Sequence, residues 1–260
     1  MINLLQGDSS QYKDPEVSPE GPTSTAPLDE DIAARNAELV EKYADSLYEA
    51  SAAEILRWAH EHAPGPLVVT LSMENTVLAE LSKRYLPGAD FLFLDTEYHF
   101  PETLEVAEKV EQRYPEHTLV RATAQLSRRE QDEVYGPNLY RRNPTACCRM
   151  RKVEPLAVHM SPYVGWVTGV RRADGPTRAE APALSLDRTG RLKLSPLVTW
   201  SLEDTDAFIA DHDLIVHPLT TQGYPSIGCA TCTLPVAEGE DPRAGRWAFA
   251  QKTECGLHTD

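Results

Sequence analysis

The sequence predicts an α/β fold in which a doubly wound, mostly parallel sheet is covered by helices on both faces. Short apolar runs of strand length recur along the chain, and segments with helical periodicity separate them. Such alternation is typical of βαβ units, which bind ligands at the carboxyl ends of their strands. Since 41% of the 260 residues are hydrophobic, we expect one globular domain with loosely packed ends.

The first predicted elements are two helices behind a polar arm. Apolar residues recur at helical spacing from about Ile32 to Tyr48, and a second helix is predicted over 52–61, before the Pro64-Gly65-Pro66 stop. Residues 8–30 hold many prolines and acids but almost no large apolar side chains. We therefore expect residues 1–31 to form a disordered or loosely packed arm, laid across a partner subunit of a homo-oligomer.

Four apolar runs are the predicted strands of the sheet, at 67–71, 91–95, 118–121 and 164–168. Ser72 is expected to cap the helix that follows the first strand, and Pro101 to begin the helix after the second. A polar helix is expected over 127–135. Further along, the runs 183–186 and 192–194 predict a hairpin, and a last helix is expected from Ser201 to near His212.

Charge and composition narrow the class of function. A net charge of -15 argues against broad binding to nucleic acid or to an anionic membrane, so an anionic substrate needs a local cluster of Lys and Arg. No apolar run reaches the roughly eighteen residues that cross a bilayer, and the N-terminus lacks the pattern of a signal peptide. We expect a cytoplasmic protein, in which cysteines indicate metal or redox chemistry because disulfides would be reduced.

Four of the cysteines form two close pairs, Cys147-Cys148 and Cys229-x-x-Cys232. Four thiolates are the number that a tetrahedral zinc or an iron–sulfur cluster takes. From spacing alone, a structural zinc beside two small buried hydrophobic residues remains an equally good interpretation. Lys152 lies four residues after Cys148, one helical turn along, where it would face a negatively charged cluster. An ordinary surface lysine is the alternative.

Residues 241–260 are predicted to form a mobile C-terminal tail that carries the fifth cysteine, Cys255. Lys252 and His258 would lower the pKa of this thiol from its usual value of about 8.5, which favours the nucleophilic thiolate. Arg243 and Arg246 are spaced to hold one oxyanion between them, or else form a solvated basic turn. After the strand end at 168–169, where nucleotide contacts are expected, three arginines follow: Arg171, Arg172 and Arg178.

Five motifs follow one another along the chain. They are Cys147-Cys148-Arg149-Met150-Arg151-Lys152, Thr168-Gly169-Val170-Arg171-Arg172, Gly228-Cys229-x-x-Cys232, Arg243-Ala244-Gly245-Arg246-Trp247 and Glu254-Cys255-Gly256-Leu257-His258. In this order they resemble the motifs of the assimilatory adenylyl-sulfate reductases that carry a [4Fe-4S] cluster, and the resemblance runs from about residue 40 to the end of the chain.

The resemblance implies an adenine-nucleotide alpha hydrolase-like fold over residues 32–240 and a catalytic tail over 241–260. It implies thioredoxin-dependent reduction of adenylyl sulfate to sulfite and AMP, through an S-sulfocysteine, in sulfate assimilation and cysteine biosynthesis. The implied site residues are the cluster ligands Cys147, Cys148, Cys229 and Cys232; the nucleophile Cys255; Lys152, Arg243, Arg246 and His258 around the transferring group; and Ser72, Gly169, Arg171 and Arg178 as substrate contacts.

The loop Ser72-Met73-Glu74-Asn75 departs from the wider family, whose Ser-x-Gly-x-Asp-Ser loop wraps a diphosphate. The glycines are absent, and Asn75 stands where many members have Asp, so the contacts of this loop stay open.

Three alternatives remain. A phosphoadenylyl-sulfate reductase shares the terminal motif but lacks the other four cysteines. An RNA-thiolating enzyme of the same fold needs an intact diphosphate loop and usually a basic surface. A non-enzymatic zinc or iron–sulfur module leaves Cys255 and the arginine pair without a function.

Overall fold

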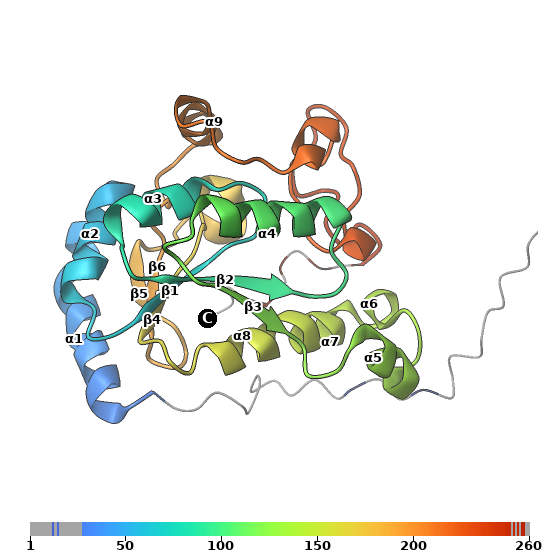
Figure 1. The fold of residues 1–260 in the computed structure, drawn as a ribbon, viewed down its shortest axis with the longest axis horizontal. Coiled ribbons are helices and arrows are strands. Elements are labelled where there is room, and N and C mark those ends of the chain that lie inside the picture. The colour runs from blue at the N-terminus through green and yellow to red at the C-terminus, as the bar shows by residue number, and fades with distance from the viewer. Residues whose placement is uncertain are drawn as a thin grey trace, which may run out of the picture.

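A computed structural model of the chain describes residues 28–250 together with Tyr12, Pro15, Lys252, Glu254, Gly256 and Leu257. Its centre is a six-stranded sheet with the order β3-β2-β1-β4-β6-β5. All neighbouring strands are parallel except β5, which runs antiparallel to β6 at one edge. Helices cover the sheet on both faces (Figure 1). The predicted doubly wound, mostly parallel α/β fold is confirmed.

The two N-terminal helices begin at side-chain caps. Helix α1 (Glu30–Leu47) begins two residues before the predicted Ile32, because the Asp29 carboxylate accepts hydrogen bonds from the N–H groups of Asp31 and Ile32. Helix α2 (Ala52–His62) begins with a capping box between Ser51 and Glu54. Ahead of them, the ring of Tyr12 packs directly on Gly136, where a Cβ would lie 2.5 Å from it. The other residues of the predicted arm up to residue 27, apart from Pro15, lie outside the described residues.

The first half of the sheet matches the predicted alternation. It comprises β1 (Leu67–Thr70), α3 (Val77–Tyr85), β2 (Asp90–Asp95), α4 (Pro101–Arg113), β3 (Leu119–Thr123) and α5 (Arg128–Tyr135). Pro101 is the first residue of α4, as predicted. The expected cap by Ser72 is wrong: α3 begins at Val77, and its N–H donates to Asn75 Oδ1 over 3.2 Å. Ser72 Oγ accepts instead from the N–H of Glu74.

The second half contains short helices without a clear sequence signal. These are α6 (Leu139–Arg142), α7 (Pro144–Cys148), a π-helix η2 (Arg149–Val153) and α8 (Glu154–His159). Strand β4 (Gly165–Val167), the predicted hairpin of β5 (Leu184–Leu186) and β6 (Leu192–Leu194), and α9 (Leu202–Asp211) follow. Short 3₁₀ helices complete the chain at η3 (Arg172–Asp174), η4 (Pro176–Arg178), η5 (Pro218–Gln222) and η6 (Ala230–Cys232).

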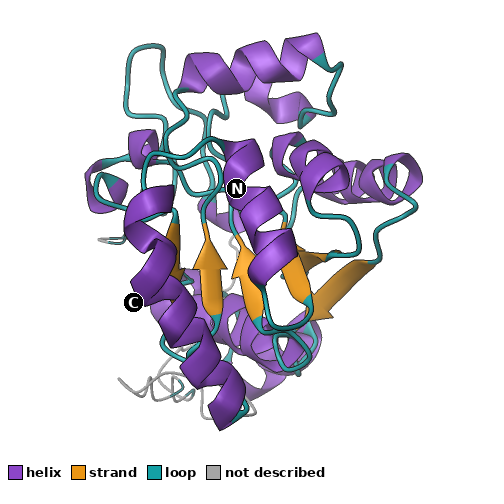
Figure 2. Cartoon of the chain, turned by 90° about the vertical axis from the view of Figure 1, so that its left-hand side faces the viewer, coloured by secondary structure: helices purple, strands orange, loops and turns teal. Residues whose placement is uncertain are grey.

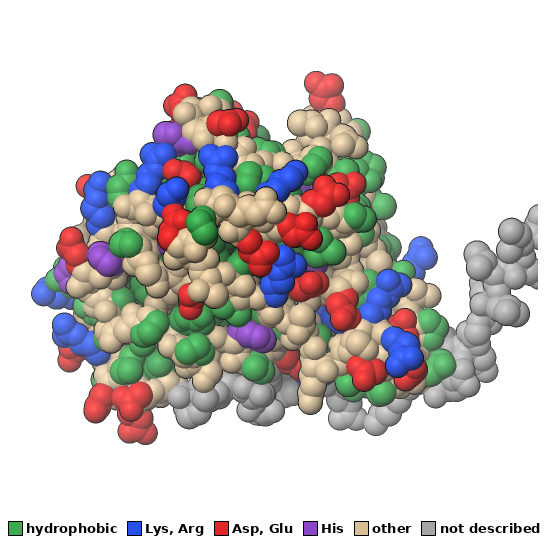
Figure 3. Space-filling model, viewed as in Figure 1, with side chains coloured by type: hydrophobic (Ala, Val, Ile, Leu, Met, Phe, Trp, Pro, Cys, Tyr) green, Lys and Arg blue, Asp and Glu red, His purple; other side chains and the backbone are tan. Residues whose placement is uncertain are grey.

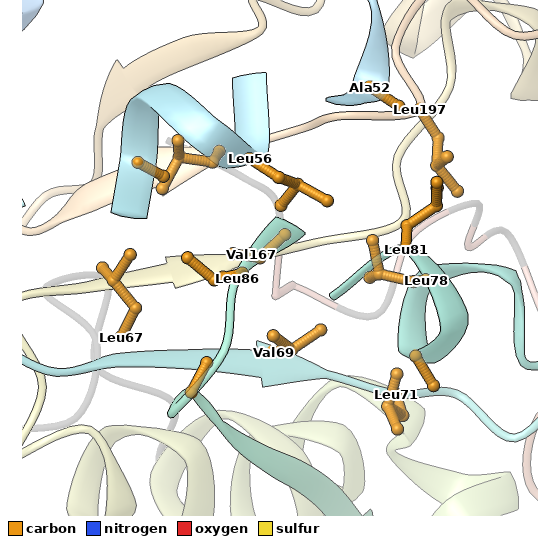
Figure 4. Packing of buried hydrophobic residues seen from close by; sticks show 14 of the residues in the cluster. Ala52, Leu56, Leu67, Val69, Leu71, Leu78, Leu81, Leu86, Val167 and Leu197 are labelled. Atoms are coloured by element: carbon orange, nitrogen blue, oxygen red, sulfur yellow. The ribbon is translucent and has the colours of Figure 1, made fainter. Parts of the chain in front are cut away.

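The core has two layers because the side chains of β1 point alternately to the two faces of the sheet. Leu67 and Val69 pack with buried side chains of α1 to α4. Val68 points to the other face and packs with Met160 and Tyr163, which follow α8 in the sequence. Figure 4 shows the larger layer, in which side chains of α2 and α3 point toward those of β1 and β4. The sheet is thereby held rigidly between the helices, which fixes the loops at its strand ends.

The strand order reverses between β1 and β4, since β2 and β3 extend to one side of β1 while β4 and β6 extend to the other. In doubly wound sheets, ligands bind outside the carboxyl ends of the strands at such a switch point. Figure 2 shows the parallel strands pointing together toward the loop-rich end of the molecule. The loops after β1 and β4, which carry Ser72 and Gly169, therefore flank the expected binding crevice.

On the face shown in Figure 3, acidic and basic side chains lie interspersed, without one continuous basic area. In the part of the chain that the structure describes, every helix is too short or too polar to cross a membrane.

Candidate functional site

A pocket beyond the carboxyl end of the sheet brings the four paired cysteines together. Its walls come from the loop after β2, from α6 to η2, and from two segments near the C-terminus. The lining residues are Tyr98, Tyr140, Pro144, Cys147, Cys148, Arg151, Lys152, Cys229, Thr231, Cys232, Arg246 and Trp247. Two pairs more than eighty residues apart in sequence thus face one space.

The adjacent cysteines end helix α7. Asn143 starts this helix, since its Oδ1 accepts from the N–H of Ala146 over 2.9 Å and Pro144 takes the first helical position. Directly after Cys148 the chain widens into the π-helix η2, a feature that is rare and frequent at functional sites. Lys152 lies on this wider turn, and its side chain lines the same pocket as both cysteines.

The second pair is carried by a tight turn that docks on the loop after β2. Cys232 N–H donates to the Cys229 carbonyl over 2.9 Å, and Ala230 N–H donates to the Tyr98 carbonyl over 2.7 Å. The hydroxyl of Thr96 lies 3.3 Å from Cys229 Sγ. Because Thr96 directly follows β2 (Asp90–Asp95), the rigid sheet sets the position of Cys229.

The Arg246-Trp247 segment is attached to the same turn. Arg246 forms an antiparallel bridge with Thr233, and the Trp247 indole packs with Cys148 and Cys232. The Arg246 guanidinium donates to Ser226 Oγ and to the Ile227 carbonyl, over 3.2 and 3.1 Å. It lies on Gly228, where a Cβ would come within 2.3 Å of Nη2, so this glycine leaves room for the arginine.

Three of the four cysteines that line the pocket are shielded from solvent. Cys147, Cys148 and Cys232 are buried, and Cys229 is partly exposed. Burial, followed by the proximity of the other three thiols, raises the pKa of Cys147. Burial also raises the pKa of Cys232 to about 11, against the lowering effects of the Thr231 hydroxyl and of Lys152. The raised pKa values of Cys147 and Cys232 favour the neutral thiol at both positions when no metal is bound.

The four cysteines that line the pocket suit a metal cofactor with four thiolate ligands. Among the described residues, no group of three or more His, Cys, Asp or Glu side chains is arranged to hold a single metal ion. One zinc ion would need its four sulfurs about 3.8 Å apart, given Zn–S bonds of about 2.3 Å. The four thiols nevertheless line one buried pocket, which fits a larger group that each cysteine reaches separately.

Basic side chains surround the thiols. Arg151 is 1% exposed and is held by Gln131 Oε1 and Glu97 Oε2, each at 2.8 Å. Within the described part of the chain, Arg151 Nη2 and Arg246 Nε are buried without a hydrogen-bond partner. With Lys152, these arginines place positive charge around a pocket whose ligands become anionic when they bind metal.

A second cluster of arginines lies beside the switch point. Arg171 is held by Asp174 and by the Thr205 hydroxyl. Arg178 binds Asp174 on one side and the carboxylate of Glu254 on the other. Arg243 also reaches Glu254, with 3.4 Å between Nη2 and Oε2. The structure thus brings Arg178 and Arg243 together at one carboxylate, whereas Arg246 points into the cysteine pocket and Arg172 binds Glu49 at the surface.

The loop after β1 connects the two clusters. Glu74 accepts from the Ile227 N–H, and burial raises the pKa of this carboxyl despite opposing effects of Arg246 and Arg171. Met73 takes φ +64° without being a glycine, and Asn75 bridges to Val216 while its Oδ1 accepts from the N–H of Val77, the first residue of α3. Ser72 is exposed at the strand end, as predicted. Asn75 therefore has a structural task in this loop.

The remaining predicted site residues divide between described and undescribed positions. Gly169 lies two residues after β4, and a Cβ added there would meet Leu78 Cδ2 at 4.0 Å and no other atom within that distance. Cys255 and His258 lie outside the described residues. Four pocket residues were not singled out from the sequence, namely Tyr98, Tyr140, Pro144 and Thr231. Tyr98 follows β2, and that strand-end position was the one signal that pointed to it.

Comparison with known proteins finds relatives that are named as reductases of a sulfated adenine nucleotide. A family model described as phosphoadenosine phosphosulfate reductase domain matches residues 66–235. The adenosine 5'-phosphosulfate reductase of Mycolicibacterium smegmatis is 48% identical over 222 residues, covering 85% of this chain and 94% of that protein. The protein of the same name from Streptomyces coelicolor is 47% identical over 221 residues, covering 85% and 93%.

Among solved structures, a phosphoadenylyl-sulfate (PAPS) reductase from Candida auris, crystallised as a phosphate complex, superposes with a TM-score of 0.64. It is 25% identical in sequence and covers 81% of this chain and 100% of that one.

Proposed function

Because the chain belongs to the phosphoadenosine phosphosulfate reductase family, we propose that it reduces adenylyl sulfate to sulfite and AMP with thioredoxin as electron donor. The observation that carries this proposal is the pocket of four thiols together with the Arg178–Arg243 cluster, which follows β4 at the switch point where a nucleotide would bind. The relatives that are 47–48% identical are named for adenylyl sulfate.

The first proposed step is a sulfuryl transfer to Cys255. Its thiolate attacks the sulfur of the sulfuryl group, an S–S bond forms, the S–O bond to the phosphate breaks, and AMP leaves with that electron pair. Lys152 and Arg246 from the cysteine pocket, Arg243 from the arginine cluster, and His258 would stabilise the negative charge on the transferring oxygens. Ser72, Gly169, Arg171 and Arg178 would hold the nucleotide.

The second proposed step releases sulfite. A thioredoxin thiolate attacks the sulfur of Cys255, the S–S bond to the sulfonate breaks, and sulfite leaves with the electron pair. The second thioredoxin thiol then resolves the mixed disulfide, returning Cys255 as a thiolate and leaving thioredoxin oxidised. The tail over residues 241–260 must therefore expose Cys255 between steps, while residues 32–240 hold the nucleotide.

Cys147, Cys148, Cys229 and Cys232 would hold a [4Fe-4S] cluster. Four thiols that line one pocket, three of them buried, support a four-iron cluster, in which each iron takes one thiolate. When bound, the cluster supplies a compact charged centre that acts electrostatically, since thioredoxin provides both electrons. Arg151 and Lys152 would offset its negative charge.

The same proposal assigns the enzyme to the cytoplasm, where thioredoxin is kept reduced, and to sulfate assimilation in cysteine biosynthesis. We also propose a homo-oligomer, which sedimentation velocity of the full chain would test.

The second candidate is a phosphoadenylyl-sulfate reductase, which the similarity to the Candida auris structure favours. Sulfite release with thioredoxin should be measured for adenylyl sulfate and for its 3'-phosphorylated form. We expect kcat/KM to be higher for adenylyl sulfate by at least about tenfold. A preference for the 3'-phosphorylated substrate would overturn the assignment.

A further inference from the structure

The carboxylate of Glu254 lies on the arginines that the proposed function gives to the anionic substrate. Arg178 binds it through two N–H groups on one edge of the guanidinium, with Nε 3.2 Å from Oε1 and Nη2 3.0 Å from Oε2. Arg243 Nη2 reaches Oε2 at 3.4 Å, and the Thr177 hydroxyl lies 3.5 Å from Oε1. Two-point binding of a planar anion by arginine is also the geometry that recognises phosphate and sulfate.

These contacts are shielded from water. The side chains of Arg178, Glu254 and Arg243 are 14, 18 and 24% exposed. Burial disfavours the charged form of Arg178, yet the carboxylates of Glu254 and Asp174 outweigh it and raise the pKa of this arginine. The ion pair is therefore less screened by water than a surface ion pair, and removing the Glu254 carboxylate would leave Asp174 as the acidic partner of Arg178 at this site.

Glu254 is covalently joined to Cys255, so a contact made by this carboxylate also constrains the proposed nucleophile. The tail passes close to the helices that carry Cys148 and Lys152 at two further points. Lys252 Nζ lies 3.4 Å from the Thr145 hydroxyl, one turn before Cys148, and a Cβ on Gly256 would lie 3.7 Å from Val153 Cγ2, beside Lys152. The described tail residues thus run across the rim of the cysteine pocket to the arginine cluster.

We propose that Glu254 is a positioning residue that latches the tail onto Arg178 and Arg243, and that an anionic substrate must displace its carboxylate to bind these arginines. This inference rests on the proposed function, because adenylyl sulfate is the anion that would compete. Two carboxylate oxygens and the oxyanions of a phosphosulfate need the same N–H donors, so both cannot be fully bound at once. Substrate binding would thereby release the tail, so that Cys255 is free to move.

The test compares Glu254→Gln with the wild type, with Glu238→Gln as the matched control. Glutamine keeps the size of the side chain but removes the charge. Glu238 is an exposed carboxylate in the same C-terminal region and is not one of the residues that bind the arginine cluster. Two quantities are measured on the holoenzyme: the rate of tryptic cleavage after Lys252 without ligand, followed by mass spectrometry, and the Kd for adenylyl sulfate by calorimetry without thioredoxin.

We expect Glu254→Gln to be cleaved after Lys252 about five to ten times faster and to bind adenylyl sulfate several-fold more tightly, because about one buried charge-assisted contact is lost. Adenylyl sulfate should also speed cleavage of the wild type, and Glu238→Gln should match the wild type in both measurements.

Equal cleavage rates of Glu254→Gln and wild type would overturn the latch, and faster cleavage with unchanged or weaker binding would overturn the competition. If the wild type binds no adenylyl sulfate, the proposed function fails, whereas the ligand-free cleavage rates still decide whether the latch exists.

Discussion

The backbone N–H of Trp247 donates a hydrogen bond to the carbonyl oxygen of Cys232 over 2.9 Å. This bond joins the Arg243–Trp247 motif to the second cysteine pair, so that one unit carries both thiols and the Arg246 guanidinium. The unit depends on Gly245, where a Cβ would lie 2.1 Å from the Leu234 carbonyl oxygen.

Gly245→Ala should therefore separate the two segments and destabilise the protein by about 1–3 kcal/mol, the usual cost of overpacking. We expect a lower melting temperature and less bound iron. Ala244→Ser, at the exposed neighbouring position, is the control and should leave both unchanged. A Gly245→Ala protein with wild-type stability and iron content would show that the close approach to Leu234 is dispensable.

Serine substitutions should distinguish the role of the four paired cysteines from that of Cys255. We expect Cys147, Cys148, Cys229 and Cys232, each replaced by serine, to lower iron and acid-labile sulfide content, because a thiolate ligand of the proposed cluster is lost. Cys255→Ser should keep full iron content under the same anaerobic purification, with absorbance near about 400 nm. Loss of iron from Cys255→Ser would place that thiol among the ligands and contradict the division of roles.

Lys152→Met should reduce activity without removing the metal. Lys152 lines the cysteine pocket from the π-helix, so the loss of its charge should lower kcat/KM for adenylyl sulfate by about 100-fold, as for one oxyanion donor. Lys83→Met, on the exposed face of α3, is the control. If Lys152→Met retains more than about half of the wild-type kcat/KM, Lys152 plays no part in stabilising the reacting group.

Stability should fall as the pH is lowered through about 6.5, the pKa of an unperturbed histidine. Burial lowers the pKa of His217, despite the opposing charge of Glu102. Its Nδ1 accepts from the Leu219 N–H over 3.2 Å, so Nε2 carries the proton and donates to Thr103 Oγ1 over 2.9 Å. The unfolded chain takes up a proton near pH 6.5 while the folded chain does so only at lower pH, which favours unfolding as pH falls between these two values.

Melting temperatures between pH 5 and 7.5 check this expectation. His217→Asn keeps an acceptor for Leu219 but cannot titrate, so its melting temperature should depend less steeply on pH than that of the wild type. His60→Asn, an exposed position on α2, should behave as the wild type does. A pH dependence of His217→Asn as steep as the wild-type curve would exclude His217 as the titrating group.

The sheet could be predicted because buried parallel strands are continuous apolar runs, as in Leu67–Thr70 and Asp90–Asp95. The short helices over residues 139–159 could not be predicted, because helices of four to six residues are too short to show a helical spacing of apolar residues. The cap of α3 was misassigned because Ser72 is a good capping residue by type, whereas α3 begins at Val77 behind Thr76, whose N–H donates to the Ile215 carbonyl 139 residues away.

At the site, the cysteine pairs could be predicted from chemistry alone, since four thiols imply a shared ligand. The environment of Arg151 could not be predicted. The surrounding sequence is as basic as a surface turn, but the Arg151 side chain is 1% exposed because Gln131 and Glu97 bind it. The pairing of Arg178 with Glu254 joins residues 76 positions apart and leaves no local pattern. Such contacts depend on tertiary packing.

The most direct test of the proposed chemistry is intact-protein and peptide mass spectrometry after the reduced enzyme has been incubated with adenylyl sulfate in the absence of thioredoxin. We expect one sulfonate group on Cys255, removed again with release of sulfite when reduced thioredoxin is added, and no adduct on Cys255→Ser. Sulfite release without any sulfonate on Cys255, or a sulfonate on Cys255→Ser, would contradict the assignment of Cys255 as the nucleophile.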